Sequence, residues 1–528
     1  MGKINSRKRP RVALTAAAAL AGFIIWCLYF VHQYNPEQGL NRQDGILTLD
    51  LAQVAERVSS GSGFTTSFIR PLSLRFSDSL LHHPELTHPP LYILVLAGAI
   101  KIFGARDSTL VGVSVFFFWA CLPLIWKMSR KIFGPAVAAL AIFLYLSNPL
   151  LLRYSITGGP ATFSAFLACL FLYFLYYSAA RSGWILGAGI VAGLGFLVRY
   201  SFGLWFFAAV LFIFITFPSR RLRNLVILLI GALVVVSPWL VRNLAVTGNP
   251  FFTLHAYKAF MFSDPRPGFI LWRGFSAQSL MMPRKIFFAL KKFLLGLREQ
   301  YVNALLLTGN FASVFALAAI LHRFEDRFFD HLKYAFFAMV LMEAAAFSLY
   351  RPDWNGMVAF IPWALIIASA FFIHLLGRIK RRKGWWRSLA VLFFLLLCLI
   401  PLSNMLGPRL IPHFALYNLM NIRSVGDFTP PDSILVSDVP WAVAWYGKRV
   451  CLWLPYRMED FEEIRIYRDL PLAGFYLTRL YFGPYYTPQE RSPDWEKIYQ
   501  TGWIPVGWNL EFKNLLPDNQ IFISRRPY

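Results

Sequence analysis

Long apolar runs alternate with short basic clusters over most of this chain. Each run approaches the roughly 20 residues that an α-helix needs to cross a bilayer, so the pattern predicts about eleven transmembrane helices. The predicted helices cover residues 12–31, 107–126, 135–152, 161–180, 184–198, 202–217, 225–241, 302–321, 332–350, 356–376 and 386–406. The run 89–103 has only about 15 residues, and we expect it to lie as a helix at the outer surface.

Basic residues gather at alternate ends of these runs and thereby orient the chain. The clusters lie at 3–11, 127–131, 181, 220–223 and 378–383. By the positive-inside rule these clusters are cytoplasmic, so we expect a cytoplasmic amino terminus and an outer carboxyl terminus. No small-residue cleavage pattern follows the run 12–31, which favours a retained helix over a signal peptide.

Composition supports a membrane protein. Hydrophobic residues make up 57% of the chain and charged residues 15%, with a mean hydropathy of +0.51, which excludes a soluble globular protein. The formal charge of +25 is accounted for by the basic clusters, so no nucleic-acid partner is predicted. The five cysteines show neither a disulfide framework nor metal-ligand spacing.

The polar remainder forms two outer loops and a separate domain. We predict a transmembrane domain over residues 1–406, with outer loops at 33–106 and 242–300. Beyond it the composition becomes that of a soluble protein, where 433–437 and 450–454 predict strands and 441–446 and 460–468 predict helices. Residues 407–528 are therefore expected to form a C-terminal extracytoplasmic α/β domain, in which Asp438 follows a strand as a ligand position or a helix cap.

The first outer loop carries the candidate chemistry. Asp44 and Asp50 follow the first helix, and either carboxylate can serve as a general base or cap a surface helix. His82, His83 and His88 match no strict metal-ligand spacing, so no histidine metal site is predicted. A divalent ion, although no motif supports one, would sit more naturally on carboxylates.

Four arginines depart from the charge rule. They stand at the outer ends of different predicted helices and are Arg153, Arg199, Arg242 and Arg351. Each one alone can reach lipid headgroups or cap helix carbonyls. As a set they favour an anion, because guanidinium groups bind phosphate oxygens in a bidentate manner. Asp353, close to Arg351 in sequence, is either its salt-bridge partner or a further outer carboxylate.

Ordered motifs in the outer loops resemble a known family. The segments are 44–52 (DGILTLDLA), 61–66 (GSGFTT), 88–92 (HPPLY), 237–243 (SPWLVRN) and 248–251 (GNPF). In order and spacing they resemble the GT-C membrane glycosyltransferases, and more closely glycosyltransferase family 39, the relatives of protein O-mannosyltransferases and of bacterial lipid A aminoarabinose transferases. The resemblance covers most of the membrane part and implies a bacterial inner (plasma) membrane.

The resemblance implies a GT-C fold and an inverting transfer of a sugar from a polyprenyl-phosphate donor to a lipid, glycan or protein acceptor on the extracytoplasmic face. It implies Asp44 as the first choice for the base and Asp50 as the second, with the four arginines on the donor phosphate. The other outer-loop candidates are His88, Tyr92, Asn243, Lys258 and Asp353. Membrane lipids are the remaining expected partners, and no cofactor is implied with certainty.

One departure from the family leaves alternatives open. Its members usually carry a second acid in the second outer loop, but residues 153–161 (RYSITGGPA) contain none. Inverting transfer needs only one base, so activity is compatible with this loop. A lipid-linked sugar transporter or flippase and an inactive carrier-binding relative are the alternatives. Glu343, an acid within a predicted span, is the feature that best suits a transporter. The sequence identifies neither the donor sugar nor the acceptor.

Overall fold

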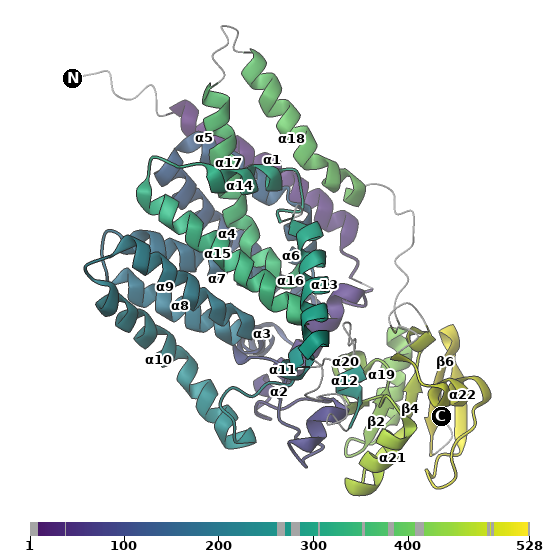
Figure 1. Ribbon diagram of the computed structural model, residues 1–528. Helices are drawn as coiled ribbons and strands as arrows, with labels where there is room; N and C mark the ends of the chain where they lie inside the picture. The colour runs from purple at the N-terminus through teal and green to yellow at the C-terminus, as the bar shows by residue number, and fades with distance from the viewer. Residues whose placement is uncertain are drawn as a thin grey trace.

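The computed structural model describes residues 9–36, 38–260, 270–275, 286–304, 307–350, 354–378, 385–406, 417–482, 486 and 490–525. A large helical part contains most of the chain, and a smaller part containing strands lies at one end of it (Figure 1). The short helices α2 (Ile46–Ser59), α11 (Leu254–Phe260) and α12 (Ile270–Arg273) lie between the two parts. This arrangement fits the expected membrane domain with an outer α/β region.

The helical part is that of an integral membrane protein. Among the described residues, seven helices are long and apolar enough to cross a membrane. They are α1 (Arg9–Gln33), α4 (Asp107–Phe133), α7 (Ala161–Ser178), α10 (Arg221–Thr247), α15 (Arg327–Tyr350), α17 (Ile361–Arg378) and α18 (Trp385–Leu406). Shorter apolar helices are α3 (Pro90–Phe103), α8 (Trp184–Val198), η3 with α9 (Tyr200–Gly203, Leu204–Thr216) and α14 with η6 (Ala312–Ala318, Ala319–Leu321). The total of about eleven spans stays a prediction.

Two expected helices are interrupted. The run 135–152 bends by 56° between α5 (Pro135–Leu146) and α6 (Pro149–Ser155). Asn148, which precedes Pro149, is extended and caps α6 by accepting a hydrogen bond from the Leu151 amide at 3.0 Å. The prediction of one continuous helix over 302–321 was wrong, because α13 (Ile286–Ala304) and α14 flank a turn in which Gly309 adopts a φ of +67°.

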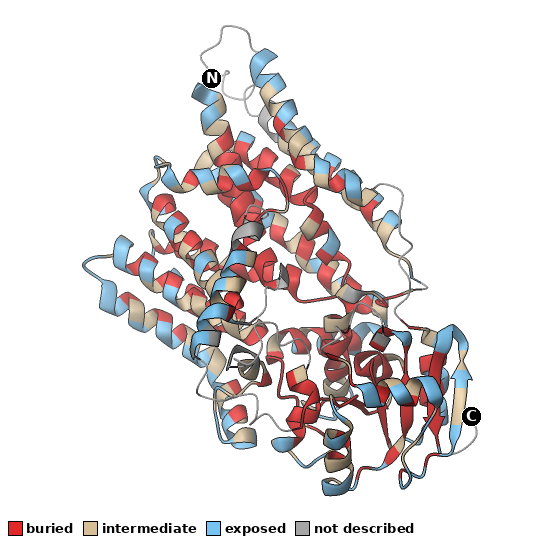
Figure 2. Ribbon diagram, turned by 45° about the vertical axis from the view of Figure 1, so that its right-hand side comes forward, coloured by how far each residue is buried: buried red, intermediate tan, exposed pale blue. Residues whose placement is uncertain are grey.

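Burial separates the central helices from the peripheral ones. In α7 and α17, 72% and 78% of the most apolar stretch is buried, against 11%, 22% and 17% in α1, α10 and α18. The peripheral helices turn exposed residues outward along their length (Figure 2). Their exposed side chains include Leu20, Val234 and Leu392, a surface suited to lipid tails rather than to water.

A six-stranded sheet forms the core of the smaller part. Its strand order is β1-β3-β2-β4-β6-β5, and its strands are β1 (Phe68–Ile69), β2 (Ile434–Ser437), β3 (Cys451–Trp453), β4 (Leu472–Leu477), β5 (Phe512–Leu516) and β6 (Gln520–Ser524). The accompanying helices are α19 (Leu419–Phe428), α20 (Pro440–Tyr446), α21 (Met458–Tyr467) and α22 (Pro493–Thr501). The predicted α/β character is thus confirmed, including both predicted strands and both predicted helices.

The first outer loop supplies one strand of this sheet. β1 pairs with β3 in parallel, with Phe68 opposite Cys451 and Ile69 opposite Leu452. Phe68 is 2% exposed and packs edge-on against Trp453, with ring centroids 5.3 Å apart. The sheet therefore joins the first outer loop to the C-terminal region through backbone hydrogen bonds and a shared core.

A buried arginine joins the second outer loop to the same region. Arg273 ends α12 and is 0% exposed. Its guanidinium donates to the carbonyl oxygens of Leu454 at 2.7 Å, Glu490 at 2.6 Å and Pro455 at 3.3 Å. Three carbonyl acceptors compensate the desolvation of the cation, so both outer loops are fixed to the strand-containing part.

Replacing Phe68 with alanine should destabilise the outer region. The change leaves a cavity between β1 and Trp453, for which we expect a cost of about 3–5 kcal/mol and a clearly lower apparent Tm. The matched control is Phe251→Ala, because Phe251 is 69% exposed and its loss should leave the Tm nearly unchanged. Equal melting temperatures for the two variants would contradict the buried role of β1.

Candidate active site

Asp44 lies directly before α2 and faces the second outer loop. It belongs to the short 3-10 helix η1 (Gln43–Gly45), and its carboxylate accepts hydrogen bonds from Arg153 Nε at 2.7 Å and Nη2 at 2.6 Å. Arg153 stands on α6, beyond the bend after α5. The Asp44 side chain is 27% exposed and that of Arg153 45% exposed, so this bidentate pair remains accessible. The N-cap of α2 is Gly45, with no side-chain cap, so Asp44 does not cap that helix.

Asp50 lies inside α2 and is enclosed. Its Oδ2 accepts hydrogen bonds from Arg70 and from His88 Nε2, the latter at 2.9 Å. Asp50 is 6% exposed and Arg70 3% exposed. Burial raises the pKa of Asp50, but the positive charge of Arg70 and the contact with His88 outweigh it and leave the pKa below the ordinary value. Asp50 is therefore a buried anion that holds three segments of the loop together.

Glu85 is a buried acid that the sequence reasoning did not single out. Its Oε1 accepts hydrogen bonds from the backbone amides of Thr87 at 2.7 Å and His88 at 2.9 Å. Its Oε2 is buried and has no hydrogen-bond partner in the described part of the chain. The available signal was its position three residues before His88-Pro89-Pro90, where an upstream carboxylate can bind amides that the extended X-Pro segment leaves unpaired.

Arg242 lies beside this turn. It donates to the Glu85 carbonyl oxygen at 2.8 Å and to Asn243 Oδ1 at 3.1 Å, and its guanidinium lies 4.8 Å from the Trp239 ring. The Trp239 Nε1 in turn donates to the Tyr200 hydroxyl at 3.0 Å. Since α10 runs on to Thr247, Arg242 lies within the helix rather than at its end.

The other candidate residues fall into separate places. Arg199 follows α8 and lies 5.4 Å from the Phe347 ring. The Tyr92 hydroxyl donates to the Gly158 carbonyl at 2.7 Å, and Asn243 Nδ2 donates to the Pro250 carbonyl at 3.3 Å, so both brace neighbouring loops. Arg351 and Asp353 lie outside the described residues. Lys258 belongs to α11, but its side chain is also outside them.

The arginines therefore lie in different surroundings. Arg153 is paired with Asp44. Arg199 directly follows α8 and Arg242 lies in α10; these helices pack together, and Tyr200 after α8 is bonded to Trp239 of α10. Phosphate binding by the set stays a prediction.

The three histidines have different partners. His82 Nδ1 lies 3.3 Å from Arg57, His83 Nδ1 lies 2.9 Å from the Ser79 carbonyl, and His88 contacts Asp50. Within the described ranges, no three histidine, cysteine or acidic side chains are grouped as metal ligands. His83 is buried, and this burial lowers its pKa to about 4.

Two more acids noted from the sequence are buried. Asp438 accepts hydrogen bonds from the Thr478 amide and hydroxyl, at 3.0 Å and 2.7 Å, and from the Tyr481 amide at 3.2 Å. Burial raises the pKa of Asp438 to about 7, while these donors oppose the rise. Asp438 thus ties the end of β2 to the end of β4. Glu343 lies in α15 at 0% exposure, and its carboxylate has no hydrogen bond within the described residues.

Comparison with known proteins identifies the fold. The family model for dolichyl-phosphate-mannose-protein mannosyltransferase matches residues 87–241. None of the curated proteins matches the chain. Together with the solved structures described next, these findings show that the chain has the fold of the GT-C membrane glycosyltransferases, as its motifs suggested.

Solved structures are similar over nearly the whole chain. Cupriavidus metallidurans ArnT bound to undecaprenyl phosphate has a TM-score of 0.56 at 13% identity, covering 98% of both chains. The Archaeoglobus fulgidus oligosaccharyltransferase in the apo form has a TM-score of 0.57 at 14% identity, covering 89% of this chain and 69% of its own. The oligosaccharyltransferase AglB of the same organism, with an inhibitory peptide and a dolichol-phosphate, has a TM-score of 0.56 at 13% identity, covering 99% of this chain and 75% of its own.

The burial of His83 predicts a dependence of stability on pH. The unfolded chain takes up a proton near the ordinary pKa of 6.5, whereas folded His83 does so only near 4. The free energy of unfolding should therefore fall by about 3 kcal/mol in total as the pH drops from about 6.5 to below 4. At neutral pH this contribution to stability is fully present.

His83→Asn tests this assignment. An asparagine amide can still donate to the Ser79 carbonyl but does not titrate, so the apparent Tm should fall less between about pH 7 and pH 4 than in the native protein. The control His32→Asn removes an exposed histidine. An unchanged pH profile in His83→Asn would show that His83 does not supply the dependence.

Proposed function

We propose that this protein transfers a sugar from a polyprenyl-phosphate carrier to an acceptor hydroxyl at the outer membrane face, with Asp44 as the base. The observation that carries this proposal is the accessible pair of Asp44 and Arg153, contributed by the first and second outer loops. It places a carboxylate and a guanidinium side by side, and the reaction needs both kinds of group.

The chemistry assigns each group one part. The Asp44 carboxylate takes the proton of the acceptor hydroxyl as its oxygen bonds to the anomeric carbon. The bond between that carbon and the carrier phosphate oxygen breaks, and the phosphate leaves with the electron pair. Arg153 binds the Asp44 carboxylate through Nε and Nη2 and is therefore suited to orient the base. We propose the other arginines of the predicted set, Arg199 and Arg242, for the charge on the departing phosphate. Attack from the face opposite the phosphate inverts the anomeric configuration.

The structure favours Asp44 over Asp50 for contact with substrate. Asp50 is enclosed, and Arg70 and His88 both contact its Oδ2, so it is suited to positioning. His88, held by Asp50 through its ring and by Glu85 through its amide, is thereby fixed at the start of α3. The missing acid of the second outer loop has a cationic counterpart here, since that loop supplies Arg153 to the acid of the first.

The fold relatives support the donor class. The ArnT structure contains undecaprenyl phosphate and the AglB structure a dolichol-phosphate. A polyprenyl-phosphate sugar is accordingly the donor we propose for this chain, with a lipid, glycan or protein as acceptor. The proposed setting is a bacterial inner membrane, with the sheet-bearing end outside.

Asp44→Asn should abolish most of the transfer while preserving the fold. We expect a rate lower by about 100-fold or more, because the amide cannot accept the proton, with little change in Tm. The assay incubates purified protein with radiolabelled polyprenyl-phosphate sugars and a membrane extract, and follows labelled product. The control Asp78→Asn removes an 85% exposed carboxylate from the same loop and should retain activity.

Asp50→Asn separates positioning from catalysis. Loss of this carboxylate leaves Arg70 buried without its counter-charge, so we expect destabilisation by about 3–5 kcal/mol and a lower Tm.

Full transfer activity in Asp44→Asn would overturn the assigned base. Movement of labelled lipid-linked sugar across the membrane by the native protein, without any transfer product, would overturn the reaction class.

A further inference from the structure

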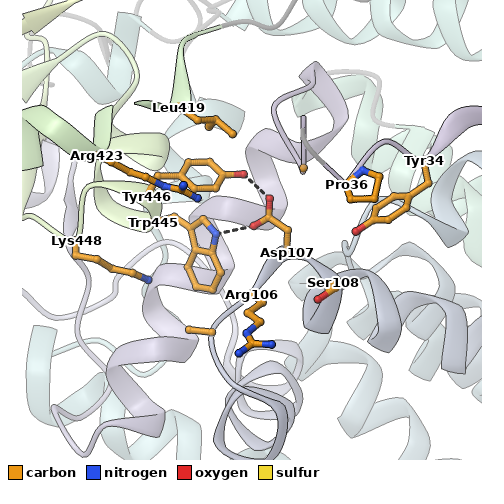
Figure 3. A pocket seen from close by; sticks show the side chains of 12 residues that line it. Tyr34, Pro36, Arg106, Asp107, Ser108, Leu419, Arg423, Trp445, Tyr446 and Lys448 are labelled. Carbon is orange, nitrogen blue, oxygen red and sulfur yellow. Dashed lines mark hydrogen bonds between the residues drawn. The ribbon is translucent and has the colours of Figure 1, made fainter. Parts of the chain in front are cut away.

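A pocket lies where the helical part meets the C-terminal region, beside the ends of two membrane helices. It has a volume of about 360 Å³, in the range of small-molecule sites. One wall comes from the chain just after α1 and from the start of α4, and the other from α19, α20 and Lys448 (Figure 3). The pocket is therefore at the level where these spans leave the apolar layer.

Asp107, the only acid among the described lining residues, is fully engaged. Its Oδ1 accepts from Trp445 Nε1 at 2.8 Å, and its Oδ2 accepts from the Tyr446 hydroxyl at 2.6 Å and the Leu40 amide at 3.0 Å. Figure 3 shows both aromatic side chains turned toward this carboxylate. Asp107 thus fixes the two walls relative to each other, and its negative charge is already compensated by three donors.

Two of the cationic side chains that line the pocket can still bind an anion. Lys448 is paired with Glu56 at 2.6 Å, but Arg106 and Arg423 make no side-chain hydrogen bond or ion pair with the described part of the chain. Both arginines are exposed and come from opposite walls. Two guanidinium groups without such partners, one on each wall, favour an anionic ligand, and phosphate oxygens match the fork geometry of either group.

Apolar side chains next to the pocket indicate an amphipathic ligand. Ile102 and Phe103, just before the lining residues Ala105 and Arg106, are 74% and 68% exposed. Met420, next to the lining residue Leu419, is 77% exposed. Such a rim can bind acyl or prenyl chains, whereas a freely soluble phosphate compound would leave these apolar side chains uncovered.

We propose that this pocket binds the phosphate headgroup of an anionic lipid, that the exposed side chains of Arg106 and Arg423 turn inward from opposite walls onto the phosphate, and that Tyr34, Trp445 and Tyr446 surround the rest of the headgroup. The tails would lie over Ile102 and Phe103. Gly39, another lining residue, belongs to the same turn-rich segment that leads to Asp44, so the bound lipid would brace the approach to that residue. Lipid binding here does not depend on the proposed transfer reaction.

Native mass spectrometry of the full chain tests the proposal. The protein is released from nanodiscs of phosphatidylcholine with phosphatidylglycerol as the anionic probe, and retained phosphatidylglycerol is counted as its fraction is varied. R106Q/R423Q should weaken retention by about tenfold or more, because charge-assisted contacts to phosphate are lost. The control R181Q/R220Q removes two exposed arginines elsewhere in the helical part and should not reduce it comparably.

A second variant and a competitor complete the test. S108W fills the pocket while keeping both arginines, and it should also lower retention. Glycerol 3-phosphate carries the phosphate without tails and should compete only weakly. Unchanged retention in both pocket variants would overturn the site. Equal binding of glycerol 3-phosphate and phosphatidylglycerol would overturn the lipid assignment in favour of a soluble phosphate compound.

Discussion

The buried carboxylate of Asp50 is the interaction on which the organisation of the first outer loop depends. A charge removed from water must be compensated, and here Arg70 and His88 compensate it from two other segments. Arg70 directly follows β1, and His88 directly precedes the proline pair that starts α3. One ion-pair cluster therefore fixes α2, the loop strand of the outer sheet and the next helix relative to one another.

This constraint separates structural acids from an accessible one. Asp50, Glu85 and Asp438 are buried and accept hydrogen bonds from backbone amides or basic side chains. Asp44, in contrast, has a partly exposed side chain at the loop surface. The rigid surroundings hold Asp44 opposite Arg153 without burying either group. Arg273 and Asp107 reinforce this arrangement from the second outer loop and from the start of α4, because each binds residues of the C-terminal region.

Local pattern was sufficient for much of the fold. Apolar runs predicted the membrane helices, and the short strands and helices near Asp438 followed from alternation and composition. The break at Asn148 and Pro149 was missed, although an extended residue before proline is a local signal. β1 has only two residues and exists because β3 lies beside it, so no local pattern reveals it. Sequence named Asp44 and Arg153 separately, but only the structure brings them together, and it added Glu85.

The strand contributed by the first outer loop has a consequence for biogenesis. β1 and β3 come from opposite ends of the chain, so their pairing is a contact of very high sequence separation. Such contacts form late, because closing the long intervening loop costs chain entropy before the contact between the two strands contributes any stability. The loop that carries Asp44 thus reaches its final conformation only after the C-terminal region has been synthesised and has reached the same side of the membrane. Maturation of the candidate active site is in this way coupled to synthesis of the segment that contains β3.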